Sequence, residues 1–473
     1  MSFRIRRNVY RLPAGDETLD WYRRAVEVMM SRPITDPTSW NYMGAVHGNP
    51  FRQTPPGAAP FWDQCQHQSW YFLPWHRAYI TAFEAMVAKA VESLGGPADW
   101  ALPYWDYSED LSANPEARRM PPAFRDEILP NGDRNFLWSR RFQVTNGDFG
   151  FSDFDVDLGA LDEAEFTPAF GPGAGFGGLP TAFNAFGGTS GALEMTPHNA
   201  IHNRIGGFMR NPATAAFDPI FWLHHCNVDR LWEEWRKRDV NHQNPTDPNW
   251  LRGVRFDMHD ADGQPFGFAS EDMLDTTQVL HGYLYDTIPT PPAAPAGGTE
   301  MVAMDEGEPE LAGTSEGAVR LEGETTSARV VMRPDMAGKS FVEDALPTPM
   351  RVFLSLENVR GAGEPSDFRV MVDLDDDTEP PLQVGLLTTF GLAQASDPGA
   401  AHGGIGVTQV FDITGAADRL QLTTDAAPKL RVTFERVAEG AVAESVPPGL
   451  EELVPESPTE PRVEVGRISV FFR

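Results

Sequence analysis

Histidine is distributed unevenly along this chain, and that distribution sets the first limit on how the chain can fold. Ten of the eleven histidines lie before residue 288, in a section that is also rich in Trp and Phe. At 473 residues the chain is long enough for two domains, and its 41% apolar content suits large cores. We therefore expect a histidine-rich domain over residues 1–287 and a domain of different character behind it.

The histidine-rich section has the pattern of a helical bundle. In residues 16–32, apolar positions recur at close to helical spacing. Residues 74–96, 196–207 and 218–238 each begin with a proline in the first turn, and the first two of these segments end at paired glycines. The long stretch from about 107 to 192 is rich in Gly, Pro and Phe, and we expect it to form loops at the rim of a site.

The last third of the chain has another texture. A linker rich in Pro, Gly and acidic residues is predicted over residues 288–325. Behind it, runs such as "MRVFLSLENV" and "KLRVTFERV" alternate Val, Leu and Phe with polar residues, and turn signals separate them. This pattern predicts a β-rich domain over residues 326–473. The expected fold class is thus a mainly α-helical bundle followed by an all-β, sandwich-like C-terminal domain, with a barrel as the other form.

The net charge and the composition argue against several classes of binding partner and cellular location. A formal net charge of −30 argues against nucleic acid and against an anionic membrane surface as partners. No run of 18 apolar residues is long enough to span a membrane, and the N-terminus lacks the apolar centre of a secretory signal. Cys65 and Cys226 are the only cysteines, too few for a disulfide framework. We expect a cytoplasmic protein by default, with export through a partner protein left open.

One short stretch, "HQSWYFLPWHRAY", places two histidines among aromatic residues. His67 and His76 are nine residues apart, so on a single continuous helix their side chains would point in opposite directions. A helix that begins at Pro74 leaves His67 outside, free to turn back toward His76. A lone buried histidine is more often a satisfied core residue than a metal ligand, so the interpretation depends on whether other histidines join this pair.

Three further segments supply such companions. His198 and His202 share one helix face at i and i+4, His225 follows on another helix, and His47 lies in an upstream loop. The zinc-protease motif HExxH is not met, because Asn199 stands where the Glu is required. Imidazole-rich sets with few carboxylates suit copper or zinc better than magnesium or calcium. The ligand types alone therefore indicate a transition-metal site, copper or zinc, for one or two ions.

Two longer motifs resemble those of type-3 copper proteins, the group of tyrosinases, catechol oxidases and haemocyanins. "HQSWYFLPWHRAYITAFE" is similar to the first copper motif of that family, and "DPIFWLHHCNVD" to the second, in which the later of the paired histidines is the ligand. The "YLY" at 283–285 and the β-rich tail also resemble plant polyphenol oxidases. The resemblance implies six copper ligands: His47, His67 and His76 for copper A, and His198, His202 and His225 for copper B.

The resemblance implies a phenol oxidase that uses two copper ions and O2 to convert o-diphenols to o-quinones. Its partners would be small phenols and O2, with a copper-delivery protein as a further candidate and the oligomeric state undetermined. A haemocyanin-like oxygen carrier and an o-aminophenol oxidase are the two alternatives. The single dicopper unit favours an oxidase over a carrier, which usually strings many units together. Pro212 stands thirteen residues before His225, where plant enzymes can carry a bulky gate, and predicts an open entrance.

Cys65 lies two residues before His67, where some family members bond a cysteine sulfur to the ligand imidazole. The resemblance therefore implies a thioether between Cys65 and His67, and the alternative is a small buried thiol. Such a bond would fix the orientation of the imidazole ring without taking part in the chemistry.

Phe221 and Asp229 stand one helical turn on either side of His225, where they would pack against and orient that imidazole. Asp106, in "YWDY", is another candidate for orienting a ligand, and an ordinary structural role is the alternative for both acids. We expect two further charges in the motifs to be structural: Arg77 and Glu84.

Glu194 and Asn199 are the candidate catalytic residues. Glu194 lies four residues before His198, where family members place a carboxylate that holds a water, and Asn199 directly follows His198, where an Asn helps to orient that water. Such a water could take the proton of a phenol, whose pKa is near 10, and so permit monophenol hydroxylation. The alternative is that Glu194 is only an acid near a helix N-terminus. The resemblance also predicts that residues 301–473 cover the copper pocket until the linker is cut.

Overall fold

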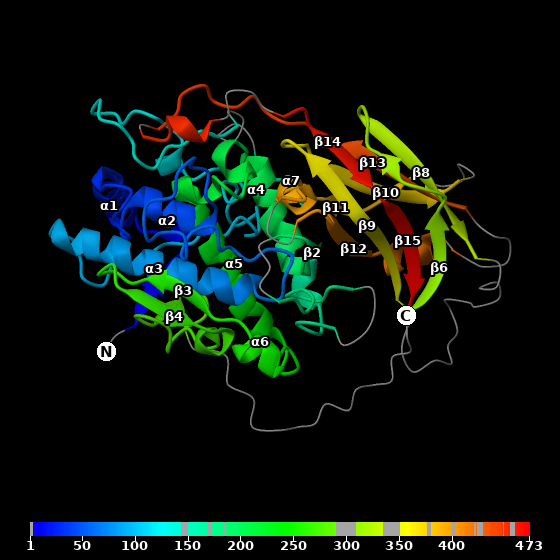
Figure 1. The fold of residues 1–473 in the computed structure, drawn as a ribbon, viewed down its shortest axis with the longest axis horizontal. Helices are drawn as coiled ribbons and strands as arrows, with labels where there is room; N and C mark the ends of the chain where they lie inside the picture. Colours follow the sequence, from blue (N-terminus) through cyan, green and yellow to red (C-terminus); the bar gives the residue numbers. More distant parts are fainter. Residues whose placement is uncertain are drawn as a thin grey trace.

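A helical body and a β-rich body lie side by side in the computed structural model (Figure 1). Among the residues that the structure describes, no helix is both long and apolar enough to cross a lipid bilayer. The described residues are 3–142, 150–168, 173–182, 186–289, 309–333, 351–375, 380–399, 403–420, 422, 429–447, 449–454 and 459–473.

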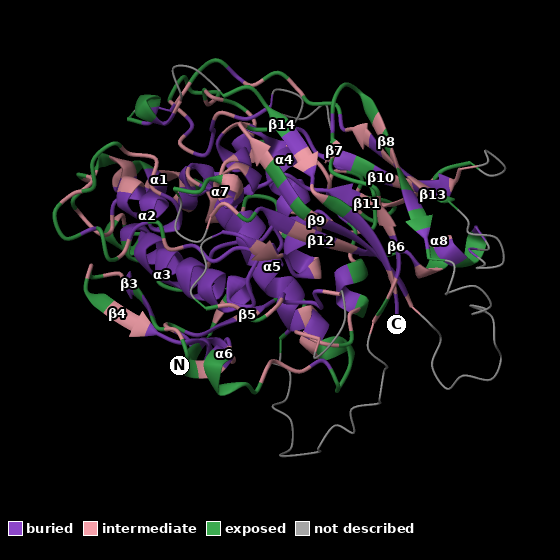
Figure 2. Cartoon of the chain, turned by 45° about the vertical axis from the view of Figure 1, so that its right-hand side comes forward, coloured by how far each residue is buried: buried purple, intermediate pink, exposed green. Residues whose placement is uncertain are grey.

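The helical domain is built around two long, buried helices that pack against each other, α3 and α5 (Figure 2). Helix α1 packs against α3, and the stacked rings of Phe83 and Trp222, 3.5 Å apart, join α3 to α5. The helices are α1 (Thr18–Ser31), α2 (Trp40–His47), α3 (Phe72–Ser93), α4 (Ala200–Ile205), α5 (Pro219–Arg238) and α6 (Pro248–Arg252). Much of the described chain between α3 and α4 is loop, as the sequence predicted.

Two helix starts show how the local sequence sets the position of the histidines. Helix α3 begins at Phe72, two residues earlier than predicted, so Pro74 occupies the first turn, where a missing N–H costs no hydrogen bond. His67 still lies outside the helix. Helix α5 begins at Pro219, and the Asp218 side chain accepts a hydrogen bond from the backbone N–H of Ile220, as the capping pattern predicted.

Thr196 interrupts the helical segment that leads into α4. Its φ of −141° and ψ of 126° are extended values inside the segment Glu194–Asn199, and α4 itself is counted only from Ala200. The predicted helix start at Thr196 and Pro197 therefore corresponds to a break between two short helical pieces. This break places Glu194 on one piece and His198 on the next.

A network of buried charges ties the start and the end of the helical domain to its centre. Strand β1 (Arg4–Arg6) pairs in parallel with β5 (Tyr283–Tyr285). Arg6 donates to Glu84 at 2.8 Å, and Arg77 donates to Asp229 at 2.6 Å. Arg77 and Glu84 thus have the structural roles expected of them. Breaking such a buried pair costs about 3–5 kcal/mol, because the remaining charge stays buried without compensation.

The C-terminal domain forms one hydrogen-bonded sheet in the order β11-β10-β13-β8-β6-β15-β9-β12, with β6 at Glu310–Ser315. A short strand of the helical domain, β2 (Gly188–Thr189), pairs in parallel with β12 at the edge of this sheet. The sheet curls, so that β11 and β12 also contact each other. Its strands include β8 (Thr325–Met332), β9 (Val352–Ala362), β10 (Phe368–Leu374), β11 (Leu382–Leu387), β12 (Val407–Asp412), β13 (Lys429–Arg436), β14 (Arg462–Val465) and β15 (Arg467–Phe472). Two short helices, α7 (Leu392–Ser396) and α8 (Thr414–Arg419), complete the described part of the domain.

The β-domain begins earlier in the chain than predicted. Strands β6 (Glu310–Ser315) and β7 (Val319–Arg320) lie inside the segment expected to be a linker, and β6 pairs with β15 and β8. The sequence of β6, "ELAGTS", is rich in small and polar residues and lacks the β-branched alternation of the other strands. Residues 290–308, the centre of the predicted linker, lie outside the described residues.

Candidate metal centre

Three histidines from different segments meet in the first cluster. His47 ends α2, His67 lies in the loop before α3, and His76 lies on α3 itself. Their ring centroids are 5.3 to 5.5 Å apart, and all three rings are buried. Their ligand atoms fall within 4.8 Å of one another, as shared binding of one ion requires. The turn of the chain before α3 thus brings His67 back to His76.

The second cluster is built from the break before α4 and from α5. The ring centroids of His198 and His202 are 4.6 Å apart, and those of His198 and His225 are 4.9 Å apart. The Nε2 atoms of His202 and His225 approach to 3.2 Å. The clusters also touch each other, since the rings of His76 and His225 stack at 4.6 Å. Two adjacent histidine sites result: the first holds the three residues that the resemblance implied, and the second holds its implied three together with His224.

Backbone carbonyls fix the ring orientation of three of these imidazoles, and a side-chain amide that of a fourth. Each interaction involves Nδ1 and so directs the Nε2 lone pair toward the cluster. The Nε2 atoms of His47, His76 and His198 are buried and have no hydrogen-bond partner in the part of the chain that the structure describes. The Nδ1 partners are Pro212 O for His47 at 2.8 Å, Phe72 O for His76 at 2.8 Å, Met209 O for His202 at 2.6 Å and Asn199 Oδ1 for His198 at 2.8 Å.

Burial keeps the imidazoles neutral, which is the form that binds metal. It lowers the pKa of His47 to about 4 and that of His198 to about 3, and it lowers the pKa of the other ligand histidines well below the usual value. Three neutral nitrogen ligands per ion, with no carboxylate or thiolate among them, suit copper. The residues therefore fit a pair of copper ions.

A seventh imidazole, His224, lies beside the second cluster. Its ring stacks on that of His198, with centroids 5.3 Å apart. The hydroxyl of Tyr107 lies 3.1 Å from its Nδ1, and its Nε2 has no hydrogen-bond partner among the described residues. The paired histidines in the sequence were the signal for this arrangement, but helical geometry alone did not reveal it.

Of the two residues expected to orient His225, Phe221 contacts its ring and Asp229 binds other partners. Phe221 packs on the His225 ring with centroids 4.0 Å apart. The carboxylate of Asp229 instead accepts from Arg77, Tyr283 and Tyr285, and its described hydrogen bonds include none to an imidazole. Arg77 holds the pKa of Asp229 below its usual value despite burial. Asp229 therefore belongs to the charge network, and it reaches the copper site only through the position of α5.

Asp106 also has a structural role among the described residues. Its carboxylate accepts from Ser108 at 2.6 Å and forms an ion pair with Arg230 at 3.1 Å. Both partners lie in the loop or on α5, and neither is a ligand histidine. Asp106 thus stabilises the loop that carries it, and the ring nitrogens of the histidines are left to other partners.

Cys65 and His67 lie in contact, as their spacing suggested. The Sγ of Cys65 is 3.3 Å from Nδ1 of His67, and both residues are buried. Burial raises the pKa of the Cys65 thiol well above its usual value, so the free side chain is a protonated thiol. The described structure holds Cys65 as a free cysteine, and the thioether stays a prediction.

Glu194 lies beneath the loop that carries His67. Its two carboxyl oxygens accept from the backbone N–H of Gln68 at 2.7 and 3.0 Å, and the residue is buried. Burial raises the pKa of Glu194 to about 8. Asn199 accepts from His198 through Oδ1 and donates through Nδ2 to Thr388 of the C-terminal domain at 3.4 Å. Both candidate catalytic residues thus lie at the edge of the histidine clusters.

The mouth of the site is covered by aromatic rings, and the open gate that Pro212 suggested for the helical domain alone stays a prediction. Phe390 follows strand β11, and its ring stacks on His202 at 4.1 Å and approaches His67 at 5.5 Å. Phe186, from the loop before β2, stacks on His67 at 5.2 Å. Only 3% of Phe390 is exposed. The identity of this covering residue could not be predicted, because nothing near it in the sequence marks it.

Known proteins resemble this chain in both sequence and fold. The family model for the common central domain of tyrosinase matches residues 37–173 and 174–238, and one for a domain of unknown function matches residues 308–448. A tyrosinase from Hahella sp. is 39% identical over 451 residues, covering 89% of this chain and 92% of that protein. Polyphenol oxidase E of Solanum lycopersicum is 30% identical over 246 residues, covering 48% of this chain and 39% of that protein.

Solved structures extend the likeness to the tail. Latent apple tyrosinase superimposes with a TM-score of 0.63 at 21% identity, covering 100% of this chain and 97% of that chain. A latent aurone synthase, itself a polyphenol oxidase, gives 0.64 at 19% identity over 100% of this chain and 89% of that one. These likenesses show a shared fold across both domains. Together with the two histidine clusters and the full-length likeness to the Hahella protein, they show that the chain belongs to the tyrosinase family and is a dicopper phenol oxidase that uses O2.

Proposed function

We propose that this enzyme hydroxylates monophenols in addition to oxidising o-diphenols. The observation that carries the proposal is a buried carboxyl group, Glu194, beside the loop of His67, with a pKa raised to about 8. A general base is most effective when its pKa lies near the working pH. An ordinary carboxylate, with a pKa near 4.5, would be far too weak to take the proton of a phenol.

The copper site and the side chains around it have separate roles in the proposed reaction. Copper bound by the histidines would activate O2, which is the electron acceptor of the reaction. Glu194 accepts the phenolic proton through a water, while Asn199 holds that water and keeps the ring of His198 in place through its Oδ1. Phe221 and the buried aromatic residues around the histidines exclude other water. A diphenol loses its first proton more readily, so its oxidation depends less on this base.

Two substitutions test the proposal. Glu194→Gln keeps the shape of the side chain but removes the base, and we expect the monophenol rate to fall by about 10²-fold, with a much smaller change for catechol. Asn199→Gly should also lower the monophenol rate more than the catechol rate. Glu27→Gln, on the exposed face of α1, is the matched control. In the unmodified enzyme, the monophenol rate should rise as the pH approaches about 8, because the carboxylate form accepts the proton.

Equal losses on both substrates in Glu194→Gln would contradict the base assignment and favour the name catechol oxidase. The same assays should include an o-aminophenol, the substrate of the alternative oxidase. A clear preference for the o-aminophenol over catechol would mean that the substrate of this site is an aminophenol and not a phenol. Assays use protein from which the tail has been removed, so that access to the pocket does not limit the rates.

We also propose that the C-terminal domain keeps the enzyme latent. The carrying observation is Phe390, whose ring lies on His202 and beside His67 and His198 in the position an aromatic substrate would need. An aromatic ring in that place competes directly with a phenol for the same surface. Hydrogen bonds from Asn203 to Asp367 and from Asn199 to Thr388 hold the covering loop against the helical domain.

A further inference from the structure

One short segment, residues 209–212, carries a support for each metal site, and we name it the strap. The carbonyl of Met209 accepts from His202 Nδ1 at 2.6 Å, and the carbonyl of Pro212 accepts from His47 Nδ1 at 2.8 Å. Met209 lies in the 3-10 turn Gly207–Arg210, and Pro212 is the second residue after the end of this turn. Only two residues separate these carbonyls, so a displacement of the strap moves a ligand of copper A and a ligand of copper B together.

The helical domain holds the strap through a glycine. Gly48 directly follows His47, and a Cβ built on it would lie 2.7 Å from the Pro212 carbonyl oxygen and 2.6 Å from Ala213 Cα. Both are backbone atoms, which cannot swing aside as the end of a long side chain can. The φ of Gly48, −153°, is open to any residue, so the close approach and not the backbone conformation requires glycine here.

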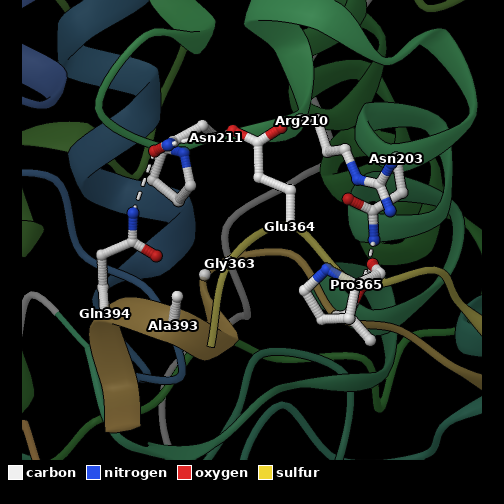
Figure 3. Close-up of a pocket in the computed structure, with 11 residues that line it drawn as sticks. Asn203, Arg210, Asn211, Gly363, Glu364, Pro365, Ala393 and Gln394 are labelled. Atoms are coloured by element: carbon white, nitrogen blue, oxygen red, sulfur yellow. Dashed lines mark hydrogen bonds between the residues drawn. The ribbon is translucent and has the colours of Figure 1, made fainter. Parts of the chain in front are cut away.

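The C-terminal domain holds the strap from the other side (Figure 3). Arg210, which is 7% exposed, forms a two-armed ion pair with Glu439, with one N–O distance of 2.7 Å. Asn211 accepts from Gln394 at 2.9 Å and donates to Glu364 at 3.3 Å. Both central residues of the strap are therefore bound by tail residues. A small cavity of about 20 Å³, room for one water, lies between the strap and the tail.

We propose that the strap positions one imidazole of each copper site and that the docked tail clamps it, so that the tail slows the loss of copper from both sites. An imidazole whose Nδ1 is held keeps its Nε2 directed at the metal, and second contacts of this kind change metal affinity by about 10–100-fold when removed. Gly48, Arg210 and Glu439 are positioning residues in this arrangement, because they act on the histidines only through the strap. The clamp is distinct from the cover that Phe390 forms.

The glycine is tested by comparing Gly48→Ala with Gly415→Ala. Gly415, in α8, has no atom within 4 Å of its built Cβ and no unusual φ, so its substitution is the matched control. Copper per chain and the rate of copper transfer to a Cu(I) chelator are measured on full-length, copper-loaded protein. We expect Gly48→Ala to release copper about tenfold faster, from both sites, while Gly415→Ala matches the parent. A parental release rate in Gly48→Ala would overturn the positioning role.

The clamp is tested by Glu439→Gln, a partly exposed substitution that does not disturb the core. Loss of this ion pair should speed copper release on the order of threefold and leave the melting temperature of the copper-free protein unchanged. Glu357→Gln is the control, because it removes an ion pair with Arg467 inside the β-domain. Phe390→Ala separates clamp from cover, and we expect it to release copper at the parental rate. A Phe390→Ala rate equal to that of Glu439→Gln, or no change in Glu439→Gln, would overturn the clamp.

Discussion

The two domains use polar groups in opposite ways. The helical domain buries whole side chains of Arg6, Arg77 and Arg141, each paired with carboxylates, and it turns imidazoles toward metal with backbone carbonyls. In the β-domain, strand β13 alternates buried with less buried residues, and the ring that lies on the histidines is the apolar side chain of Phe390. Directional bonds therefore orient the metal ligands, whereas the ring that covers them makes only a stacking contact, and the hydrogen bonds that hold the tail lie beside it.

The largest expected effect lies in the helical domain. His76→Ala removes one of three ligands of copper A, so we expect that site to lose its copper and activity to fall to background. Metal analysis should show about one copper per chain instead of two. The control is His242→Ala, whose ring stacks on Trp235 away from both clusters and should leave copper content unchanged. A single zinc per chain in the unmodified protein would contradict the copper assignment.

Next in size is the effect of uncovering the site. Cutting the chain between about 290 and 308, before strand β6, and removing the tail should raise diphenol activity strongly, since the ring of Phe390 leaves the site. Phe390→Ala should reproduce part of that gain in the intact chain, without loss of copper. Phe411→Ala, a buried ring of the same sheet outside the described ring contacts with the histidines, is the control. Kinetics unchanged by both tail removal and Phe390→Ala would make the tail a passive companion.

A smaller effect should appear in the pH dependence of latency. Asp367 accepts from Asn203 across the domain contact, with Arg210 nearby, and burial raises the pKa of this carboxyl from 3.8 to about 7. The Asp367 carboxyl group therefore holds a proton while the tail is docked, and it loses this proton when the tail is released. Docking is strongest in acid and weakens as the pH rises from about 4 through 7. The activity ratio of intact to tail-free enzyme should rise over that window, and Asp367→Asn should flatten it.

The smallest effect concerns Cys65. If the thioether forms, the tryptic peptide that covers Cys65 to Arg77 weighs two hydrogens less than its sequence, and the thiol resists alkylation. Cys65→Ser should then change activity only a few-fold, since the sulfur orients His67 and takes no part in proton transfer. Cys226, also buried and free, serves as the internal alkylation control. A fully alkylated Cys65 in active, copper-loaded and denatured protein would exclude the bond.

The copper ligands could be predicted because the resemblance to two copper motifs implied them, and the local spacing is compatible with that set. His198 and His202 sit one turn apart, and a proline near the start of α3 was enough to place His67 beside His76. The supports of these ligands were not predictable. Met209 and Pro212 act through carbonyls, which every residue has, and Phe390 is one of 30 phenylalanines, set in place by a sheet formed far along the chain.

The misplaced linker has a similar cause. Strand β6 is held by pairing with β15, which begins more than 150 residues later, so its small and polar residues carry no strand signal of their own. Asp229 was misassigned to His225 because one helical turn separates them, while its actual partners, Arg6 and Tyr285, come from the two ends of the domain. Local periodicity identifies residues that lie close together on one helix or strand. It cannot show whether a side chain pairs instead with a residue from a distant segment.

The pairing of β1 with β5 sets an order of events during protein synthesis. Arg6 leaves the ribosome early but must wait for Tyr283 and Tyr285, so the helical domain can close only after residue 285 has emerged. Phe390 is made 105 residues later, which takes roughly 5–20 s at ~5–20 residues per second. During that interval the imidazoles are assembled and the mouth of the site is still bare. A newly made chain thus has a brief period in which copper can enter before its own tail arrives.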